Sequence, residues 1–173
     1  IYLSLHLRAN WRKLERFRAM DWGARLKNMK WDHVRQLVIL PLYREGWEVV
    51  DATLDSLAKS VWPRERMMVV LACEERARDT AEAVAVSAKE KYGDRFATFM
   101  VTWHPDGLAH EIAGKGSNIT WAAREAQRFI DAEKFPYEDI LVSAFDIDTQ
   151  VEAQYFLCLA YHFLTAEKPH RSS

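Results

Sequence analysis

Short apolar runs alternate with longer segments of helical periodicity along most of the chain. The apolar runs span residues 36–42, 67–72, 96–103 and 139–145. The segments with helical spacing span residues 47–60, 74–92, 114–133 and 151–165. Strands that alternate with helices predict an α/β domain with a mostly parallel sheet, and continuous apolar runs are typical of strands that helices cover on both faces.

Charge is spread unevenly along the chain. The first 30 residues hold eight lysines and arginines against two acids, which is 8 − 2 = +6, so the remaining residues carry −7 in a chain of net charge −1. This overall balance is not that of a nucleic-acid binder. The basic start, with Trp11, Phe17 and Trp22, suits an anionic membrane surface; a solvated helix packed on the domain is the other interpretation.

Length and composition indicate one folded domain. The chain has 173 residues, of which 49% are hydrophobic and 28% charged. We divide it into a basic, aromatic, helical segment at residues 1–34, the α/β domain at residues 35–168 and a tail at residues 169–173. No apolar run reaches the roughly 18 residues that a membrane-spanning helix needs. The abrupt start and end lead us to expect a piece of a longer protein.

The two cysteines, Cys73 and Cys158, lie in apolar stretches and fit no metal-ligand spacing. We expect both to be buried free thiols of a protein in a reducing compartment.

In parallel α/β sheets, ligands bind beyond the carboxyl ends of the strands. This rule directs attention to residues 41–46, 73–76, 103–118 and 146–149. In the last of these, alternation along a strand would place Asp146 and Asp148 on one side, with Ile147 turned into the core. Two close carboxylates suit Mg²⁺ or Mn²⁺ and leave room for phosphate oxygens. The alternative is one helix-capping and one solvated aspartate.

The other three places carry weaker signals. Gly114-Lys115-Gly116-Ser117-Asn118 opens a predicted helix, whose N-terminus favours anions, and Lys115 is within reach of a phosphate there. An ordinary Gly/Ser helix start is the alternative. Past the first strand, Tyr43 could stack on a base and Glu45 could bond a ribose hydroxyl, and an ordinary strand-to-helix loop is the alternative. Glu74 and Glu75 follow the second strand, where they either contact a ribose or base or simply favour the helix dipole.

In this order, the segments PLYREG, VVLACEE, GKGSN and FDIDT resemble family 2 glycosyltransferases with the Rossmann-like GT-A fold. The subgroup that the chain resembles is the membrane-associated, cellulose-synthase-like kind, and the similarity runs from about Gln36 to about Thr165. The resemblance implies a UDP- or GDP-sugar donor and a divalent metal. It also implies a membrane-embedded full-length protein whose donor-binding domain faces the cytoplasm.

The resemblance also implies roles for individual residues. It places the nucleoside near Pro41, Tyr43 and Glu45, and the base or ribose near Glu74 or Glu75. It places the diphosphate or its sugar near Lys115 and Asn118. It also implies that Asp146 and Asp148 bind the metal and the donor. In Tyr43-Arg44-Glu45, an arginine stands where many members have asparagine, and Cys-Glu-Glu stands where many have Asp-Asp.

An inverting transfer in this family needs a general base well downstream of the Asp-x-Asp element. Only 25 residues follow Asp148, and neither Glu152 nor Glu167 has the right context. The Gln-x-x-Arg-Trp element of processive members is absent too. We therefore expect a chain that binds a donor without turning it over. The alternatives are a non-catalytic nucleotide-binding or interaction module and a phosphatase of the haloacid dehalogenase type, whose remaining motifs would find no room here.

Overall fold

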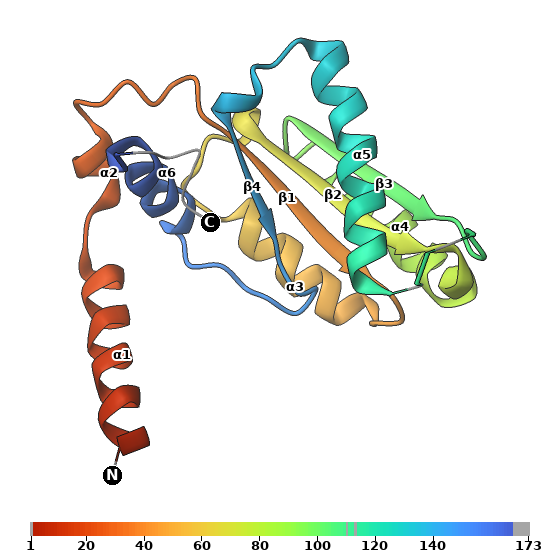
Figure 1. Cartoon of the computed structure of the whole chain (residues 1–173), viewed down its shortest axis with the longest axis horizontal. Coiled ribbons are helices and arrows are strands. Elements are labelled where there is room, and N and C mark those ends of the chain that lie inside the picture. Colours follow the sequence, from red (N-terminus) through yellow and green to blue (C-terminus); the bar gives the residue numbers. More distant parts are fainter. Residues whose placement is uncertain (1, 110, 113, 168–173) are drawn as a thin grey trace.

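The computed structural model describes residues 2–109, 111, 112 and 114–167 of the chain. Within these residues, four parallel strands form one sheet in the order β3-β2-β1-β4, with helices on both faces (Figure 1). The strands are β1 (Arg35–Leu42), β2 (Met67–Glu74), β3 (Thr98–His104) and β4 (Ile140–Ala144). The sheet confirms the predicted α/β class, and each strand lies within two residues of its predicted bounds.

Helices connect the strands as predicted. The helices are α1 (Tyr2–Ala19), α2 (Trp22–Leu26), α3 (Trp47–Ala58), α4 (Arg78–Tyr92), α5 (Lys115–Glu133) and α6 (Tyr155–Thr165). Short 3-10 turns precede β2, α4 and β4, at η1 (Arg64–Arg66), η2 (Glu75–Ala77) and η3 (Tyr137–Asp139). None of the helices in the described part of the chain is long and apolar enough to cross a membrane.

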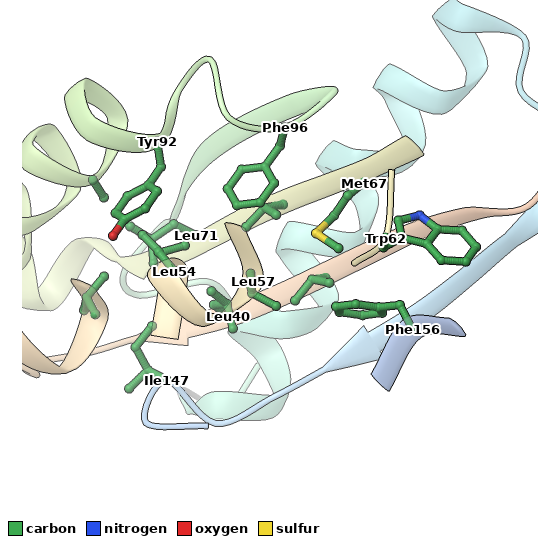
Figure 2. Close-up of a cluster of buried hydrophobic side chains, with 14 of the residues drawn as sticks. Leu40, Leu54, Leu57, Trp62, Met67, Leu71, Tyr92, Phe96, Ile147 and Phe156 are labelled. Atoms are coloured by element: carbon green, nitrogen blue, oxygen red, sulfur yellow. The ribbon is translucent and has the colours of Figure 1, made fainter. Parts of the chain in front are cut away.

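Alternating strand residues build a core on each face of the sheet. On one face, Leu40 and Leu71 pack with Leu54 and Leu57 of α3 and with Phe156 of α6 (Figure 2). The opposite face belongs to α5, whose alanines and isoleucines lie over the other set of strand residues. The buried residues of this second core are Leu37, Ile39, Met68, Val70, Ala72, Ala122, Ala126 and Ile130. Strands buried on both faces explain why β1 and β2 have continuous apolar sequences.

The N-terminal segment joins the domain through α2. Trp22 and Leu26 are buried in the same core as the sheet, and the Trp22 backbone N–H donates to Gln154 Oε1 at 2.8 Å. The predicted tail at residues 169–173 lies outside the described residues. Of the two free cysteines, Cys73 is buried as expected, but Cys158 on α6 is only half-buried.

Two helices begin later than the periodicity predicts. Residues 75–77 form the 3-10 turn η2, so α4 starts at Arg78 instead of residue 74. Residues 151–154 are not helical, and α6 starts at Tyr155. This stretch is held from outside: the Val61 N–H donates to the Ala153 carbonyl at 2.8 Å. A long-range bond of this kind leaves no trace in helical periodicity.

Candidate functional site

The strand order creates a crevice where the chain reverses its direction across the sheet. From β1 the chain moves outward to β2 and β3, and then returns to β4 on the other side of β1. Ligands of parallel sheets bind at such switch points. A cavity of about 430 Å³ opens there, and its lining residues are Pro41, Leu42, Tyr43, Glu45, Val49, Glu74, Lys115, Asn118, Asp146, Ile147 and Asp148.

The cavity brings together eight of the nine residues that the sequence nominated. They are Pro41, Tyr43, Glu45, Glu74, Lys115, Asn118, Asp146 and Asp148; Glu75 does not line it. These residues come from β1 and the loop after it, from the end of β2, from the start of α5 and from the loop after β4. Their placement is a finding about geometry, and the individual roles remain predictions.

The two aspartates lie in a turn just past the end of β4. The Thr149 N–H donates to the Asp146 carbonyl at 2.9 Å, which closes the turn. Ile147 is 5% exposed and belongs to the core, whereas Asp146 and Asp148 are exposed. The turn therefore separates the side chains in the way that strand alternation predicted, although β4 itself ends at Ala144.

Two hydroxyl groups of α3 hold this turn and the loop that follows. Thr53, which is 1% exposed, donates from Oγ1 to the Ile147 carbonyl, and Ser56 Oγ accepts from the Val151 N–H at 3.1 Å. The sequence analysis did not single out either residue. The available signal was a threonine and a serine three residues apart on an otherwise apolar helix face.

The two carboxylates suit a divalent cation whose remaining ligands come from a bound phosphate. Asp146 and Asp148 both line the cavity and offer hard oxygen ligands. Among the described residues, no group of three or more His, Cys, Asp or Glu side chains is placed to hold a metal ion. Mg²⁺ is commonly bound through one or two carboxylates and substrate phosphates, which matches this arrangement.

Lys115 stands in the first turn of α5, beside the aspartates. Its Nζ forms an ion pair with Asp146 Oδ1, and the two side chains are 53% and 67% exposed. The neighbouring glycines are not required by protein packing: a Cβ added at Gly114 or Gly116 would meet no protein atom within 4 Å. The start of α5 thus offers a positive side chain, a helix N-terminus and open space above the backbone, which together favour an anion.

Asn118 carries an unused hydrogen-bond acceptor at the floor of the cavity. The side chain is 1% exposed, and its Nδ2 donates to the Ala72 carbonyl on β2 at 2.7 Å. Its Oδ1 has no hydrogen-bond partner among the described residues. A buried acceptor without a partner costs about 1–3 kcal/mol. A ligand hydroxyl or N–H that reached it would recover part of that cost.

Two guanidinium groups lie close to the ring of Tyr43. The centre of its ring is 4.9 Å from Arg44 Cζ and 4.8 Å from Arg76 Cζ. The Glu74 carboxylate, which is nearly buried, forms an ion pair with Arg76, and this hydrogen bond raises the pKa of Arg76. Glu45 stabilises the turn at residues 43–45, because its Oε2 accepts hydrogen bonds from the backbone N–H groups of Tyr43 (2.9 Å) and Arg44 (3.1 Å). One carboxylate oxygen of Glu45 is thus already engaged.

Glu75 points to a different set of partners. Its two carboxylate oxygens accept from Arg78 Nε at 2.7 Å and from Arg78 Nη2 at 2.9 Å, which lowers the pKa of Glu75. The Arg78 guanidinium in turn lies over the ring of Trp103 on β3, 4.2 Å from its centre. Of the two glutamates proposed from the sequence, only Glu74 reaches the cavity. Burial also raises the pKa of the neighbouring Cys73 thiol to about 12, which disfavours the thiolate form.

Proline is tolerated at Pro41 because β4 ends before it. The Ile39 carbonyl accepts from the Phe145 N–H at 3.1 Å, so the backbone of Ile39 faces β4. Pro41, two residues later, faces the same way. The pairing of β1 with β4 stops at Ile39, so the missing N–H of Pro41 removes no ladder bond.

The loop between β3 and α5 is held by a pair that the sequence analysis left without a role. His104, at the end of β3 and 5% exposed, lies 2.6 Å through Nε2 from Glu111 Oε1. The His104 ring also meets the Trp121 ring of α5 edge-on, with centres 5.8 Å apart. His110, the other histidine of this loop, lies outside the described residues.

Comparison with known proteins finds likeness at the level of structure. No protein-family model matches the chain, and neither does any curated protein sequence. Mannosyltransferase PcManGT from Pyrobaculum calidifontis, solved in complex with GDP-Man and Mn²⁺, is similar to this chain with a TM-score of 0.50 and 19% identity. The likeness covers 80% of this chain and 37% of that one.

A crystal structure of S. aureus TarS 1–349 matches with a TM-score of 0.46 and 23% identity over 75% of this chain and 32% of that one. The TarS complex with UDP-GlcNAc gives a TM-score of 0.45 and 21% identity, over 75% of this chain and 31% of that one. The chain thus spans about a third of the length of these three solved structures. At such identities, the PcManGT likeness establishes the fold: a Rossmann-like α/β arrangement that a glycosyltransferase also has.

Proposed function

We propose that this chain is the donor-binding part of a glycosyltransferase, which takes a sugar from a UDP- or GDP-sugar with the help of Mg²⁺ or Mn²⁺. The observation that carries the proposal is the cavity at the switch point of the sheet. It collects two exposed carboxylates, a lysine at a helix N-terminus, an unpartnered buried amide oxygen and a tyrosine. A nucleoside diphosphate sugar, together with a divalent cation for the two carboxylates, offers a partner to each of them.

The diphosphate end of the donor belongs at the start of α5. Asp146 and Asp148 would hold the divalent cation, which supplies positive charge to the diphosphate as it leaves. Lys115 would turn from Asp146 to a phosphate oxygen, because a phosphate carries more negative charge than one carboxylate. Gly114 and Gly116 leave the space for the phosphates to approach the backbone.

The nucleoside end belongs over the loop after β1. Tyr43 lines the cavity and would stack on a base, and the guanidinium groups of Arg44 and Arg76 lie close to its ring. Glu74 reaches the same cavity and is the glutamate that we assign to the ribose or base. Asn118 Oδ1 would accept from a donor hydroxyl or N–H.

In the intact protein, we propose an inverting transfer of the family 2 type. The acceptor hydroxyl then needs a base, which we assign to a part of the protein other than the residues described. The subgroup that the sequence resembles is membrane-associated, so we place the domain on the cytoplasmic face of a membrane. The free cysteines Cys73 and Cys158 suit the reducing side of such a membrane.

The substitution Asp148→Asn tests the metal assignment. It removes one charge from an exposed side chain, so we expect an unchanged fold and the loss of metal-dependent binding of UDP or GDP. Asp94→Asn is the matched control, because Asp94 is also exposed but lies between α4 and β3, where β3 begins and not where it ends. Binding that survives Asp148→Asn unchanged would remove the metal from the proposal. If neither variant nor the parent chain binds a nucleotide, a non-catalytic module becomes the better interpretation.

A further inference from the structure

Helix α1 carries a row of arginines along one side. Arg8, Arg12 and Arg16 follow one another at intervals of four residues, so they are neighbours on the helix surface, and all three side chains are exposed. Like charges at this spacing destabilise an isolated helix. The one acid in the helix sequence, Glu15, forms its ion pair with Arg18, where Nη1 and Oε1 are 3.7 Å apart. A negatively charged surface would convert the repulsion within the row into attraction.

A different side of the same helix is apolar and unusually open to solvent. Trp11 is 60% exposed and Leu14 is 46% exposed, three residues apart. Phe17 continues the stripe but is partly buried against the domain core. In Figure 1, α1 runs away from the sheet, and its first turn lies far from the other helices.

The C-terminal end of α1 is fixed to the body, which sets the direction of the free part. The Phe17 ring stacks on Trp22 with centres 5.6 Å apart, and the Trp22 Nε1–H donates to the Phe17 carbonyl at 2.9 Å. Arg18 Nε lies 3.2 Å from Glu152 Oε1, on the loop before α6. A cavity of about 220 Å³ lies between Leu14, Phe17 and the start of α6. The apolar stripe therefore continues from the free helix into a gap beside the domain.

We propose that α1 docks the protein on an anionic lipid surface. The helix would lie in the plane of the interface, with Trp11 and Leu14 inserted among the acyl chains and with Arg8, Arg12 and Arg16 near the headgroup phosphates. A helix with aromatic and leucine side chains on one face and arginines on another is typical of this mode of binding. Because no helix in the described residues can cross a membrane, we assign α1 to the surface and not to a span.

The positive charge of α1 favours an anionic lipid surface over a second copy of the chain as its binding partner. Another copy would present the same row of arginines, so the two helices would repel each other at close approach. Anionic lipids match both the row of positive charge and the apolar stripe. The proposal concerns a surface remote from the cavity in sequence and stands whether or not the chain binds a nucleotide.

Cosedimentation of the full chain with lipid vesicles tests the proposal, without any nucleotide present. We expect binding to vesicles of phosphatidylcholine mixed with phosphatidylglycerol, weak binding to phosphatidylcholine alone, and release at high salt. Each arginine near an anionic surface strengthens binding about fivefold, so the double variant Arg12→Gln/Arg16→Gln should bind about 25-fold more weakly. The matched control, Lys89→Gln/Arg124→Gln, removes two exposed charges from α4 and α5 and should bind like the parent chain.

Two further outcomes would overturn the proposal. Equal binding to neutral and anionic vesicles would show that the arginine row plays no part. No binding to either vesicle would exclude the lipid surface, and self-association that Trp11→Ser abolishes would assign the stripe to contact between copies. Trp11 is exposed, so Trp11→Ser should leave the fold intact, which far-ultraviolet circular dichroism would verify.

Discussion

The ion pair between Lys115 and Asp146 leads to a prediction in which one substitution has effects of opposite sign. Without a ligand, the lysine neutralises one of the two carboxylates proposed for the metal. Replacing it with methionine keeps most of the side-chain volume and removes the charge. Lys115→Met should therefore tighten the binding of Mn²⁺ alone and weaken the binding of a nucleoside diphosphate.

The expected magnitudes follow from the exposure of the pair. Ion pairs between side chains as exposed as these contribute about 0.2–1 kcal/mol, so Mn²⁺ alone should bind about 1.4- to fivefold more tightly to the variant. A hydrogen bond from lysine to a charged phosphate is worth about 1.5 kcal/mol or more, so UDP or GDP should bind about tenfold more weakly. Uridine and guanosine lack the phosphates, and their affinity should not change.

Electron paramagnetic resonance of free Mn²⁺ measures the first effect, and calorimetric titration measures the second. Lys59→Met is the matched control, because Lys59 also forms an exposed ion pair with an aspartate, Asp55, but does not line the cavity. The reasoning is refuted if Mn²⁺ binds more weakly to Lys115→Met, or if the substitution weakens nucleosides as much as nucleoside diphosphates.

Two other substitutions test what surrounds the site. Thr53→Val removes the bond to the Ile147 carbonyl; we expect about 1–2 kcal/mol less stability in urea denaturation and weaker nucleotide binding, whereas unchanged binding would show that the turn holds its shape unaided. Asp51 accepts hydrogen bonds from Lys91 at 2.6 Å and from Tyr92 at 2.7 Å, which lower its pKa. Its stabilising contribution is therefore present above its unfolded pKa and is lost as the pH falls through the lower folded value. Asp51→Asn should cost about 1 kcal/mol at pH ~7, and this cost should shrink only as the pH falls below ~4 and through the folded pKa, in denaturant titrations across that range; a loss that is equal at every pH would exclude the charged form as the cause.

Much of the fold could be read from the sequence because the two central strands, β1 and β2, are buried along almost their whole length. Strands such as β1, with Leu37 and Ile39 on one face and Val38 and Leu40 on the other, are apolar at every position of their central part. Short runs of this kind, alternating with longer helical segments, are typical of strands in a parallel sheet that is covered on both faces. The start of α6 could not be read in the same way, because bonds from distant parts of the chain hold residues 151–154 out of the helix.

In the candidate site too, local sequence patterns predicted some features, whereas features that depend on long-range contacts could not be predicted. The rule that ligands bind at the carboxyl ends of parallel strands was enough to predict that Tyr43 and Asp148 lie near the same site, and both line one cavity. It could not separate Glu74 from Glu75, since that choice depends on where β2 ends and on the arginine that each glutamate binds. Nor could it reveal Thr53, whose role depends on a bond to a residue 94 positions away.

The most direct test of the central claim is calorimetric titration of the chain with UDP and with GDP, first with Mn²⁺ and then with EDTA. We predict that one of the two nucleotides binds with Mn²⁺ and that EDTA abolishes the binding, because Asp146 and Asp148 need the cation to hold a diphosphate. No binding of either nucleotide, or binding that EDTA leaves unchanged, would contradict the claim that this cavity is a metal-dependent donor site.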